Sequence, residues 1–313
     1  MVSPMRNLAS SLVLGALVVG CGAAEQPPAA PGAPIDPPRP NPDLMSMLME
    51  AGSAGGPSAE DKAKAEAQAK LKADLAKLAT DQAAEKARMT DKLRADLKAL
   101  SEKKFPNIKA ALQAALAGSH RAPGAADRDG DRHPIAQLEF FGLKTNHKVL
   151  ELDAGAGWYT EILAPVLRRE GKLTVAGPDP NGPETERSTY YARRLRGTLD
   201  KAPELGEKVD YVVVQGPGFA FADGLAGSFD MVLAFRTLHN WLRRDQLDNN
   251  LKHVFKGRKP GGVFAVEAHR GKPGSDPKTA ADRGYLPEAF VIERAQDAGF
   301  VLDGKSDINK NEK

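Results

Sequence analysis

Hydrophobic residues follow three different patterns along this chain. Residues 12–19 form one continuous apolar run that is too short to span a bilayer. Residues 61–104 contain no Gly or Pro, and their apolar positions recur at spacings of three and four, as on one face of a helix. From residue 107 onward, short apolar runs alternate with amphipathic stretches. This alternation predicts an α/β domain with a largely parallel sheet.

The helical stretch has an interrupted apolar stripe. The stripe consists of Leu71, Leu75, Leu78, Met89, Leu93, Leu97 and Leu100, with Gln82 and Glu85 in its middle. Phe105-Pro106 ends the helix, because proline disfavours helical geometry at the preceding residue. A self-associating coiled coil or helical hairpin and a solvated stalk with a thin seam both fit this pattern. We therefore predict a charged helical stalk over residues 58–106.

The remaining domain, residues 107–313, alternates between strands and helices. We predict strands at residues 148–152, 172–176, 209–214, 229–234, 263–267 and 300–305. We predict helices at residues 108–117, 134–141, 159–168, 188–199, 243–254 and 287–298.

The first 57 residues differ from the rest in composition. Residues 1–6 carry a positive charge ahead of the apolar run, and the only cysteine, Cys21, follows that run. This resembles the lipobox of bacterial lipoproteins. It implies a signal peptide at residues 1–21, lipidation of Cys21 and a lipid-anchored place in the bacterial cell envelope. The alternative is a secreted protein with a free cysteine. Residues 22–57, rich in Pro and Ala, predict a disordered tether.

The composition limits the kinds of molecule that the protein is expected to bind. The net charge of +3 is small for 313 residues and gives no basic footprint for nucleic acid. We predict a small-molecule substrate instead. The sequence V-L-E-L-D-A-G-A-G-W-Y at residues 149–159, where an apolar strand runs into a turn and an amphipathic helix, is the candidate site for a nucleotide-like cofactor. Gly155 and Gly157 lack Cβ and let a ligand approach the strand end and the helix N-terminus, although a tight strand–helix turn alone gives the same pattern.

Four features of this domain occur in the order found in class I S-adenosylmethionine (SAM)-dependent methyltransferases, which the chain resembles. They are the acid and glycines of residues 151–157, the strand and acid of residues 171–179, the turn at residues 223–230 and the Lys-Pro-Gly-Gly turn at residues 259–262. Asp153 stands where that superfamily has its first glycine. The resemblance implies a Rossmann-like sheet flanked by helices, SAM as cofactor and transfer of its methyl group to an acceptor.

The resemblance also implies which residues bind the cofactor: Glu151, Asp153, Gly155, Gly157, Trp158, Tyr159, Asp179 and Arg236. The glycines would admit the methionine and ribose, and Glu151 would hold that region. Asp179 would accept hydrogen bonds from the ribose hydroxyls, because a carboxylate offers two acceptor oxygens to a diol. In its Pro-Asp-Pro context Asp179 is equally well explained as a turn former. This cofactor site requires an open hollow after Leu152 that is not filled by Asp153 or Trp158.

Four further motifs resemble a narrower group of predicted bacterial methyltransferases: R-H-P with F-F-G at residues 132–142, G-W-Y-T-E-I-L-A-P at 157–165, F-R-x-x-H-N-W at 235–241 and E-x-H-R at 267–270. From them we predict substrate contacts by His239, Asn240, Trp241, His269 and Arg270. His239 is the candidate general base, since its ordinary pKa lies near neutrality; a structural histidine is the alternative.

These polar residues and their neighbours allow two other interpretations. A metal site made by His239, Glu267 and His269 is disfavoured, because polar residues at strand ends are commoner than ligands, and we predict no metal. Arg128, Arg132 and His133 precede the first strand of the domain, where they either cover the cofactor or solvate a loop.

Two features argue against an active enzyme. An exported protein is separated from the cytoplasm, where SAM is made. The superfamily's sheet also ends with an antiparallel seventh strand between strands five and six, and no segment after residue 305 is able to form it. A non-catalytic binding or structural module of the cell envelope is therefore the main alternative. A nicotinamide-dependent oxidoreductase fits less well, because Thr160 stands where the third glycine of G-x-G-x-x-G is required.

Overall fold

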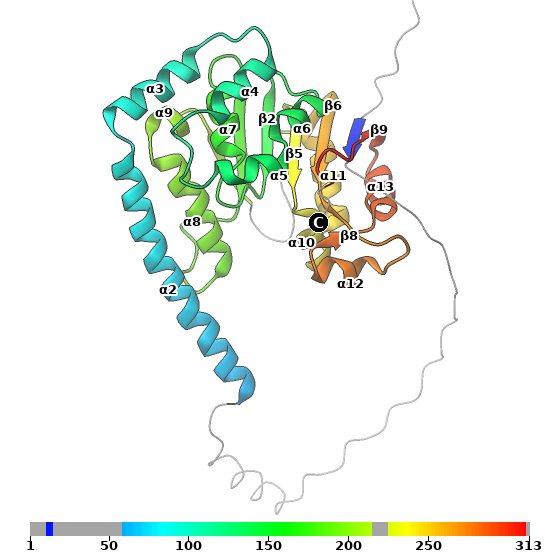
Figure 1. Cartoon of the computed structure of the whole chain (residues 1–313). Helices are drawn as coiled ribbons and strands as arrows, with labels where there is room; N and C mark the ends of the chain where they lie inside the picture. Colours follow the sequence, from blue (N-terminus) through cyan, green and yellow to red (C-terminus); the bar gives the residue numbers. More distant parts are fainter. Residues whose placement is uncertain (1–10, 15–57, 215–224, 311–313) are drawn as a thin grey trace, which may run out of the picture.

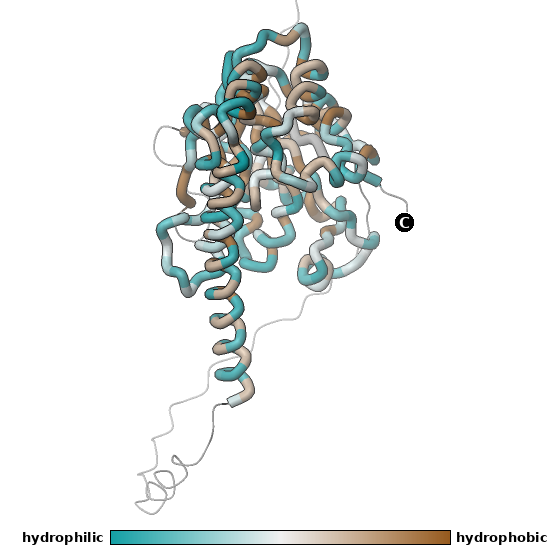
Figure 2. Tube along the Cα trace, turned by 60° about the vertical axis from the view of Figure 1, so that its left-hand side comes forward, coloured by the Kyte–Doolittle hydropathy of each residue, from teal (hydrophilic) through white to brown (hydrophobic). Residues whose placement is uncertain are grey.

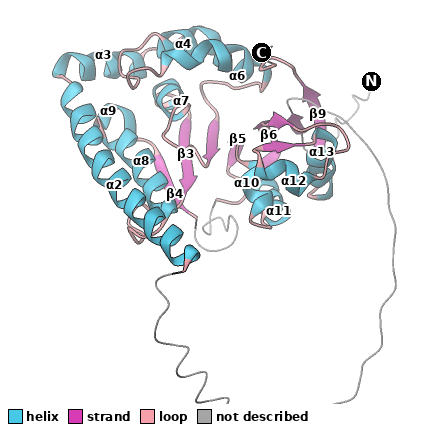
Figure 3. Ribbon diagram, turned by 60° about the horizontal axis from the view of Figure 1, so that its bottom comes forward, coloured by secondary structure: helices cyan, strands magenta, loops and turns pink. Residues whose placement is uncertain are grey.

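A computed structural model describes residues 11–14, 58–214 and 225–310, and it shows a parallel sheet between two layers of helices (Figures 1 and 3). The strand order is β4-β3-β2-β5-β6-β1-β9, and every pairing within this sheet is parallel. The strands are β1 (Ser11–Leu14), β2 (Lys148–Leu152), β3 (Lys172–Gly177), β4 (Asp210–Val213), β5 (Phe229–Phe235), β6 (Arg258–Glu267) and β9 (Val301–Lys305). The α/β fold class is confirmed.

The inner strands are buried on both faces, which explains their continuous apolar sequences. One face is covered by α3 (Asp91–Glu102), α4 (Ile108–Leu116), α6 (Pro134–Phe140), α7 (Thr160–Leu167), α8 (Arg187–Asp200) and α9 (Pro203–Gly206). The other is covered by α10 (Leu238–Arg243), α11 (Leu247–Gly257), α12 (Pro277–Asp282) and α13 (Glu288–Asp297). Each face has its own hydrophobic core, so the sheet separates the two.

The slot between β6 and β9 is occupied by the N-terminal strand β1. Leu12 pairs with Phe264 of β6 and with Leu302 of β9. The expected antiparallel last strand is absent from the described C-terminal residues, since 306–310 form no strand. The backbone groups of β6 and β9 that face each other need hydrogen-bond partners. Strand β1, which lies within the predicted signal peptide, pairs with both strands.

Residues 59–102 form two helices rather than the one long helix expected over residues 61–104. Helix α2 (Ala59–Arg88) ends at Met89, and the Thr90 side chain accepts a 3.4 Å hydrogen bond from the Leu93 amide to begin α3. A threonine in this position caps a new helix instead of continuing the old one.

The apolar seam of these helices faces the rest of the same chain. Leu71, Met89 and Leu97 are buried, and α2 lies beside α8 (Figure 1). The Gln82 amide donates to the Arg193 carbonyl at 2.7 Å. The part of α2 that extends beyond the domain is mostly hydrophilic (Figure 2). The seam thus packs within one chain, and self-association through the stalk stays a prediction.

Other boundaries shift in ways that affect the site. The helix expected over residues 243–254 is two helices, α10 and α11, so His239 and its neighbours lie in a helix. A small parallel pair, β7 (His269–Arg270) and β8 (Tyr285–Leu286), was not predicted. Two short helical segments, η1 (Ala126–Arg128) and α5 (Asp129–Arg132), precede α6. None of the described helices has the length and apolarity needed to cross a membrane.

Candidate functional site

The parallel sheet places the carboxyl ends of its central strands along one edge, where ligands bind in folds of this kind. Asp153 follows β2, Asp179 lies just beyond β3, Arg236 follows β5 and Glu267 ends β6. Two cavities lie at this edge, and Asp153 lines both. The sequence therefore brings most of the predicted cofactor residues together.

The first cavity, which we call the glycine-turn cavity, has a volume of about 450 Å³. Its lining includes Arg128, Arg132, Glu151, Asp153, Gly155, Trp158, Tyr159, Arg194, Phe235, Arg236, His239 and Glu267. The second, the β3 cavity, has about 400 Å³ and is lined by residues that include Asp153, Asp179, Ser188, Val214 and Trp241.

The two glycines of the turn have different tasks. Both have positive φ angles, +63° at Gly155 and +83° at Gly157, which favour glycine. A Cβ on Gly157 would lie 3.0 Å from Thr198 Cγ2 and 3.2 Å from Leu195 Cδ1, so this glycine lets α8 approach the turn. A Cβ on Gly155 would meet nothing within 4 Å. Gly155 therefore leaves open space beside the backbone at the cavity.

Asp153 occupies a glycine position of the resembled motif but does not fill the hollow. Its φ is +48°, a left-handed conformation that Asp tolerates better than most residues. Its carboxylate accepts hydrogen bonds from Thr237 Oγ1 at 2.6 Å and from Trp241 Nε1 at 3.0 Å. These bonds hold the side chain towards α10, on the boundary between the two cavities.

Trp158 and Tyr159 form buried walls of the glycine-turn cavity. Trp158 Nε1 donates to the Ala125 carbonyl at 2.8 Å, which anchors the indole to the segment before η1. The Tyr159 ring stacks on Phe235 with centroids 3.7 Å apart, and its hydroxyl donates to Gln137 Oε1 at 2.5 Å. Burial raises the pKa of this hydroxyl, so Tyr159 stays neutral. Neither side chain closes the hollow that the cofactor hypothesis requires.

Glu151 lies at the floor of the same cavity and is 1% exposed. Its Oε2 accepts a hydrogen bond from Thr160 Oγ1 at 2.7 Å. Burial raises the pKa of this carboxyl to about 8, and the hydrogen bond opposes only part of that shift. Glu151 is therefore mostly protonated at neutral pH and is able to donate a hydrogen bond as well as accept one.

His239 is half-buried in the wall of the glycine-turn cavity. Burial lowers the pKa of its imidazole, and the positive charges of Arg236 and Arg243 lower it further. The ring is consequently neutral at pH 7, the state in which it accepts a proton. This is the protonation state that a general base needs.

The predicted substrate residues do not form one group. Only His239 lines the glycine-turn cavity. Trp241 is 1% exposed and lines the β3 cavity through its contact with Asp153, while Asn240 lines neither cavity as the structure describes them. The sequence spacing did not reveal this separation. Residues 239–241 lie in α10, where successive side chains point to different sides of the helix.

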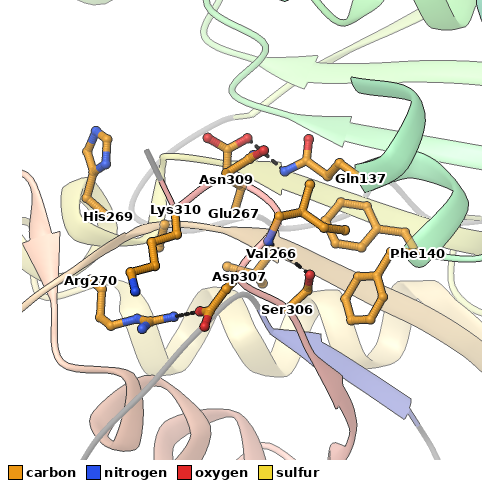
Figure 4. A pocket seen from close by; sticks show the side chains of 13 residues that line it. Gln137, Phe140, Val266, Glu267, His269, Arg270, Ser306, Asp307, Asn309 and Lys310 are labelled. Atoms are coloured by element: carbon orange, nitrogen blue, oxygen red, sulfur yellow. Dashed lines mark hydrogen bonds and ion pairs between the residues drawn. The ribbon is translucent and has the colours of Figure 1, made fainter. Parts of the chain in front are cut away.

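His269 and Arg270 line a third cavity of about 320 Å³ at the ends of β6 and β9 (Figure 4). Arg270 is paired there with Asp307 at 2.5 Å. Glu267 belongs to both this cavity and the glycine-turn cavity, and it accepts a 3.0 Å hydrogen bond from the Gln137 side chain. The three candidate metal ligands, His239, Glu267 and His269, therefore do not share one cavity: His239 lines the glycine-turn cavity and His269 lines the third. Among the described residues, no group of three or more His, Cys, Asp or Glu side chains is placed to hold a metal ion.

Asp179 lies in a turn and also at the edge of a cavity. Its Oδ1 accepts a 2.8 Å hydrogen bond from the Asn181 amide, as a turn former does, and its exposed side chain also lines the β3 cavity. Arg128 and Arg132 line the glycine-turn cavity, whereas the His133 ring lies 3.3 Å from Asn309 Oδ1.

Three residues of the site were missed by the sequence analysis. Arg194 lines the glycine-turn cavity from α8, far from any motif. Gln137 lies within the 132–142 motif region and lines the third cavity, and Thr237, within the 235–241 motif, donates to Asp153 without lining any of the three cavities. For Gln137 and Thr237 the spacing within the motifs was an available signal. Nothing in the sequence singled out Arg194.

Comparison with known proteins gives only distant likenesses. No family model matches the chain, and no curated protein matches it. Among solved structures, a SAM-dependent methyltransferase from Aquifex aeolicus is 19% identical over 63% of this chain and 89% of its own, with a TM-score of 0.41. An O-methyltransferase family protein from Burkholderia thailandensis is 19% identical over 61% of this chain and 55% of its own, with a TM-score of 0.38.

A third solved structure, an arsenic(III) S-adenosylmethionine methyltransferase from Chlamydomonas reinhardtii, is 20% identical over 49% of this chain and 52% of its own, with a TM-score of 0.37. The chain spans about half the length of these last two proteins. Function must therefore be argued from the site of this chain.

Proposed function

We propose that the chain is a SAM-dependent methyltransferase of the narrower bacterial group indicated by its motifs. The observation that carries this proposal is the pair of cavities that share Asp153 at the carboxyl edge of the sheet. The glycine-turn cavity suits the methionine end of SAM, because the open space at Gly155 admits it. The β3 cavity suits the ribose, because the exposed Asp179 carboxylate has a lone pair left for a hydroxyl.

SAM bound beside Asp153 and Gly155 would supply an electrophilic methyl group on its sulfonium. An acceptor's lone pair would take that group, while the electron pair of the broken carbon–sulfur bond would stay on sulfur. For an acceptor that carries a proton, the neutral His239 imidazole takes that proton. The buried walls made by Trp158, Tyr159 and Phe235 exclude water from the same space. Most of the rate would come from holding the two reactants in line.

A non-catalytic binding module remains a second candidate, and Asp153 favours it. This side chain brings a negative charge and a left-handed backbone to the position where the resembled motif has glycine. A protein of this kind would bind SAM in the same cavities without passing the methyl group on. Turnover on a panel of acceptors, measured with SAM labelled in the methyl group, separates the two candidates.

We also propose that the enzyme is anchored in the bacterial cell envelope through Cys21, which lies outside the described residues. The charged N-terminus, the apolar run and the position of Cys21 support this. Lipoprotein processing removes the residues before the cysteine, so an anchored chain has lost β1. The intact mass of the purified protein tests the proposal: a mass that begins at a lipidated Cys21 supports it, and a mass that still includes residues 1–20 contradicts it.

Isothermal titration of the full chain with SAM and S-adenosylhomocysteine tests the cofactor site. We expect saturable binding that weakens at least tenfold in Asp179→Asn, because the amide offers one acceptor oxygen where the carboxylate offers two. Asp210→Asn is the matched control. It lies at the opposite end of the strands, where its carboxylate pairs with Lys172, and should leave binding unchanged. Absence of binding in a folded wild-type sample would remove the proposal.

A further inference from the structure

Arginines without acidic partners are concentrated in the glycine-turn cavity. Arg128, Arg132, Arg194 and Arg236 all line it. None of the four forms an ion pair with another residue in the described part of the chain, whereas Arg121, close by in sequence, pairs with Asp129 at 2.7 Å. An unpaired guanidinium beside a concave, partly desolvated space is a site where a carboxylate or phosphate binds well.

The acidic side chains of the same cavity form hydrogen bonds or ion pairs with groups other than these arginines. Glu161 forms a buried ion pair with Lys201 and accepts the Ala122 amide at 3.0 Å. Asp153 is held by Thr237 and Trp241, and Glu267 is held by Gln137. Glu151 is mostly uncharged near neutral pH, because burial raises its pKa to about 8. In the described part of the chain, none of these carboxylates forms an ion pair with the four arginines.

One of these arginines contacts an anchored aromatic ring. The Arg132 guanidinium lies over the Trp158 ring, 4.5 Å from its centroid, and Trp158 Nε1 is itself bonded to the Ala125 carbonyl. A cation–π contact of this kind leaves guanidinium N–H groups available to an anion. Arg128 lies four residues before Arg132, at the end of η1, the short helical segment that directly precedes α5.

The cofactor accounts for only part of this positive charge. SAM has one carboxylate, and its ammonium and sulfonium groups are both cations. A single arginine matches that carboxylate, and Arg236 is the one that directly follows β5, next to β2 and its glycine turn. Binding SAM, which is a net cation, would leave the other arginines facing still more positive charge.

We propose that the methyl acceptor is itself an anion, a small carboxylate or a phosphate ester, and that Arg128, Arg132 and Arg194 bind it. This inference rests on the proposed methyltransferase function and names the substrate class of that site. The anionic group of the acceptor would lie on the side of the cavity formed by η1, α5 and α8, facing the reacting methyl group at the strand ends. Its charge would also offset that of the sulfonium.

The test uses two probes, inorganic phosphate for phosphate esters and benzoate for carboxylates, titrated calorimetrically into the full chain at constant ionic strength. We expect at least one probe to bind saturably, and its dissociation constant to rise at least tenfold in both Arg128→Gln and Arg194→Gln. Arg283→Gln removes another exposed arginine that lines none of the three cavities, and it should leave binding within twofold of wild type. Absence of binding by both probes, or an equal loss in the control, overturns the inference.

Parallel titrations with SAM separate this inference from the function on which it rests. We expect Arg128→Gln and Arg194→Gln to change the SAM dissociation constant by less than threefold. A tenfold loss of SAM affinity in these variants would assign the arginines to the cofactor and overturn the anionic acceptor while leaving the methyltransferase proposal intact. Failure of wild-type protein to bind SAM would remove the methyltransferase proposal, and the acceptor role with it, even if the anion probes bind.

Discussion

The two halves of the sheet differ in where their strands come from. In the β4-β3-β2-β5 half, neighbouring strands come from one stretch of chain. This half carries the glycine turn, Asp179 and most of the lining of both adjoining cavities, to which β6 adds Glu267. In the β6-β1-β9 half, β1 comes from the far N-terminus and β9 has alternating exposure along its length. The comparison suggests that the binding half is largely self-contained, whereas the other half depends on a distant segment.

Disrupting β1 should have the largest effect, because it should lower the stability of the β6-β1-β9 half and leave cofactor binding by the other half unchanged. In the unprocessed chain, which still carries β1, proline at Leu12 removes a ladder hydrogen bond from an inner strand and should lower the free energy of unfolding by about 3 kcal/mol. SAM affinity should stay within twofold, since β2, β3 and β5 are unaffected. Urea unfolding and titration measure the two effects. Leu17→Pro, outside β1, is the control; an equal effect of both prolines would show that β1 contributes no specific pairing.

The two glycines of the turn provide a matched pair within the binding half. Gly157→Ala should destabilise by about 3 kcal/mol, because it adds a tight contact with Thr198 and Leu195 to the cost of a positive φ. Gly155→Ala should destabilise by only about 1 kcal/mol, the cost of placing alanine at a positive φ, because the added Cβ meets open space. Chemical unfolding of both variants decides this, and equal losses would contradict the assigned tasks.

Glu151 should make the stability of the protein depend on pH. Burial raises the folded-state pKa from 4.5 to about 8, so between these values the folded state holds a proton that the unfolded state has lost. The stabilising effect of that proton is complete below pH 4.5 and is lost as the pH rises towards 8, with a slope of at most about 1.4 kcal/mol per pH unit. Glu151→Gln should flatten this slope in unfolding curves from pH 5 to 9. An unchanged slope would show that another group causes it.

The smallest expected effect concerns the contact between β2 and α10. Thr237→Val removes the 2.6 Å donor to Asp153 and should cost about 1 kcal/mol, at the lower end for a charged acceptor, because Asp153 is partly exposed. Thr237→Ser keeps the hydroxyl and should restore most of the stability. SAM affinity should fall with Thr237→Val, because the freed carboxylate is able to enter the shared boundary of the cavities.

The sequence was sufficient for features that depend on local chemistry. The glycine turn, the strands flanking it and the cavity positions of Glu151, Asp179 and His239 follow from short motifs and from the rule that parallel strands end at one edge. Features that depend on distant packing were not predictable. Arg194 reaches the cavity from α8, and the seam around Leu97 is buried by the α/β domain rather than by another stalk.

Trp241 shows a different limit of sequence analysis. Its motif suggested a ligand contact, which stays a prediction; its indole lines the β3 cavity and also donates to Asp153, so it positions that carboxylate as well. Sequence alone does not distinguish a side chain that lines a cavity from one that supports it, because helical spacing turns successive residues to different sides.

Hydrogen–deuterium exchange with and without SAM tests the central claim most directly. The account predicts that SAM slows exchange of amides in residues 153–160 and 177–182, around the glycine turn and Asp179, and leaves the amides of β6 and β9 unchanged. Unchanged exchange at the glycine turn, or protection confined to β6 and β9, would contradict a cofactor site at the end of β2.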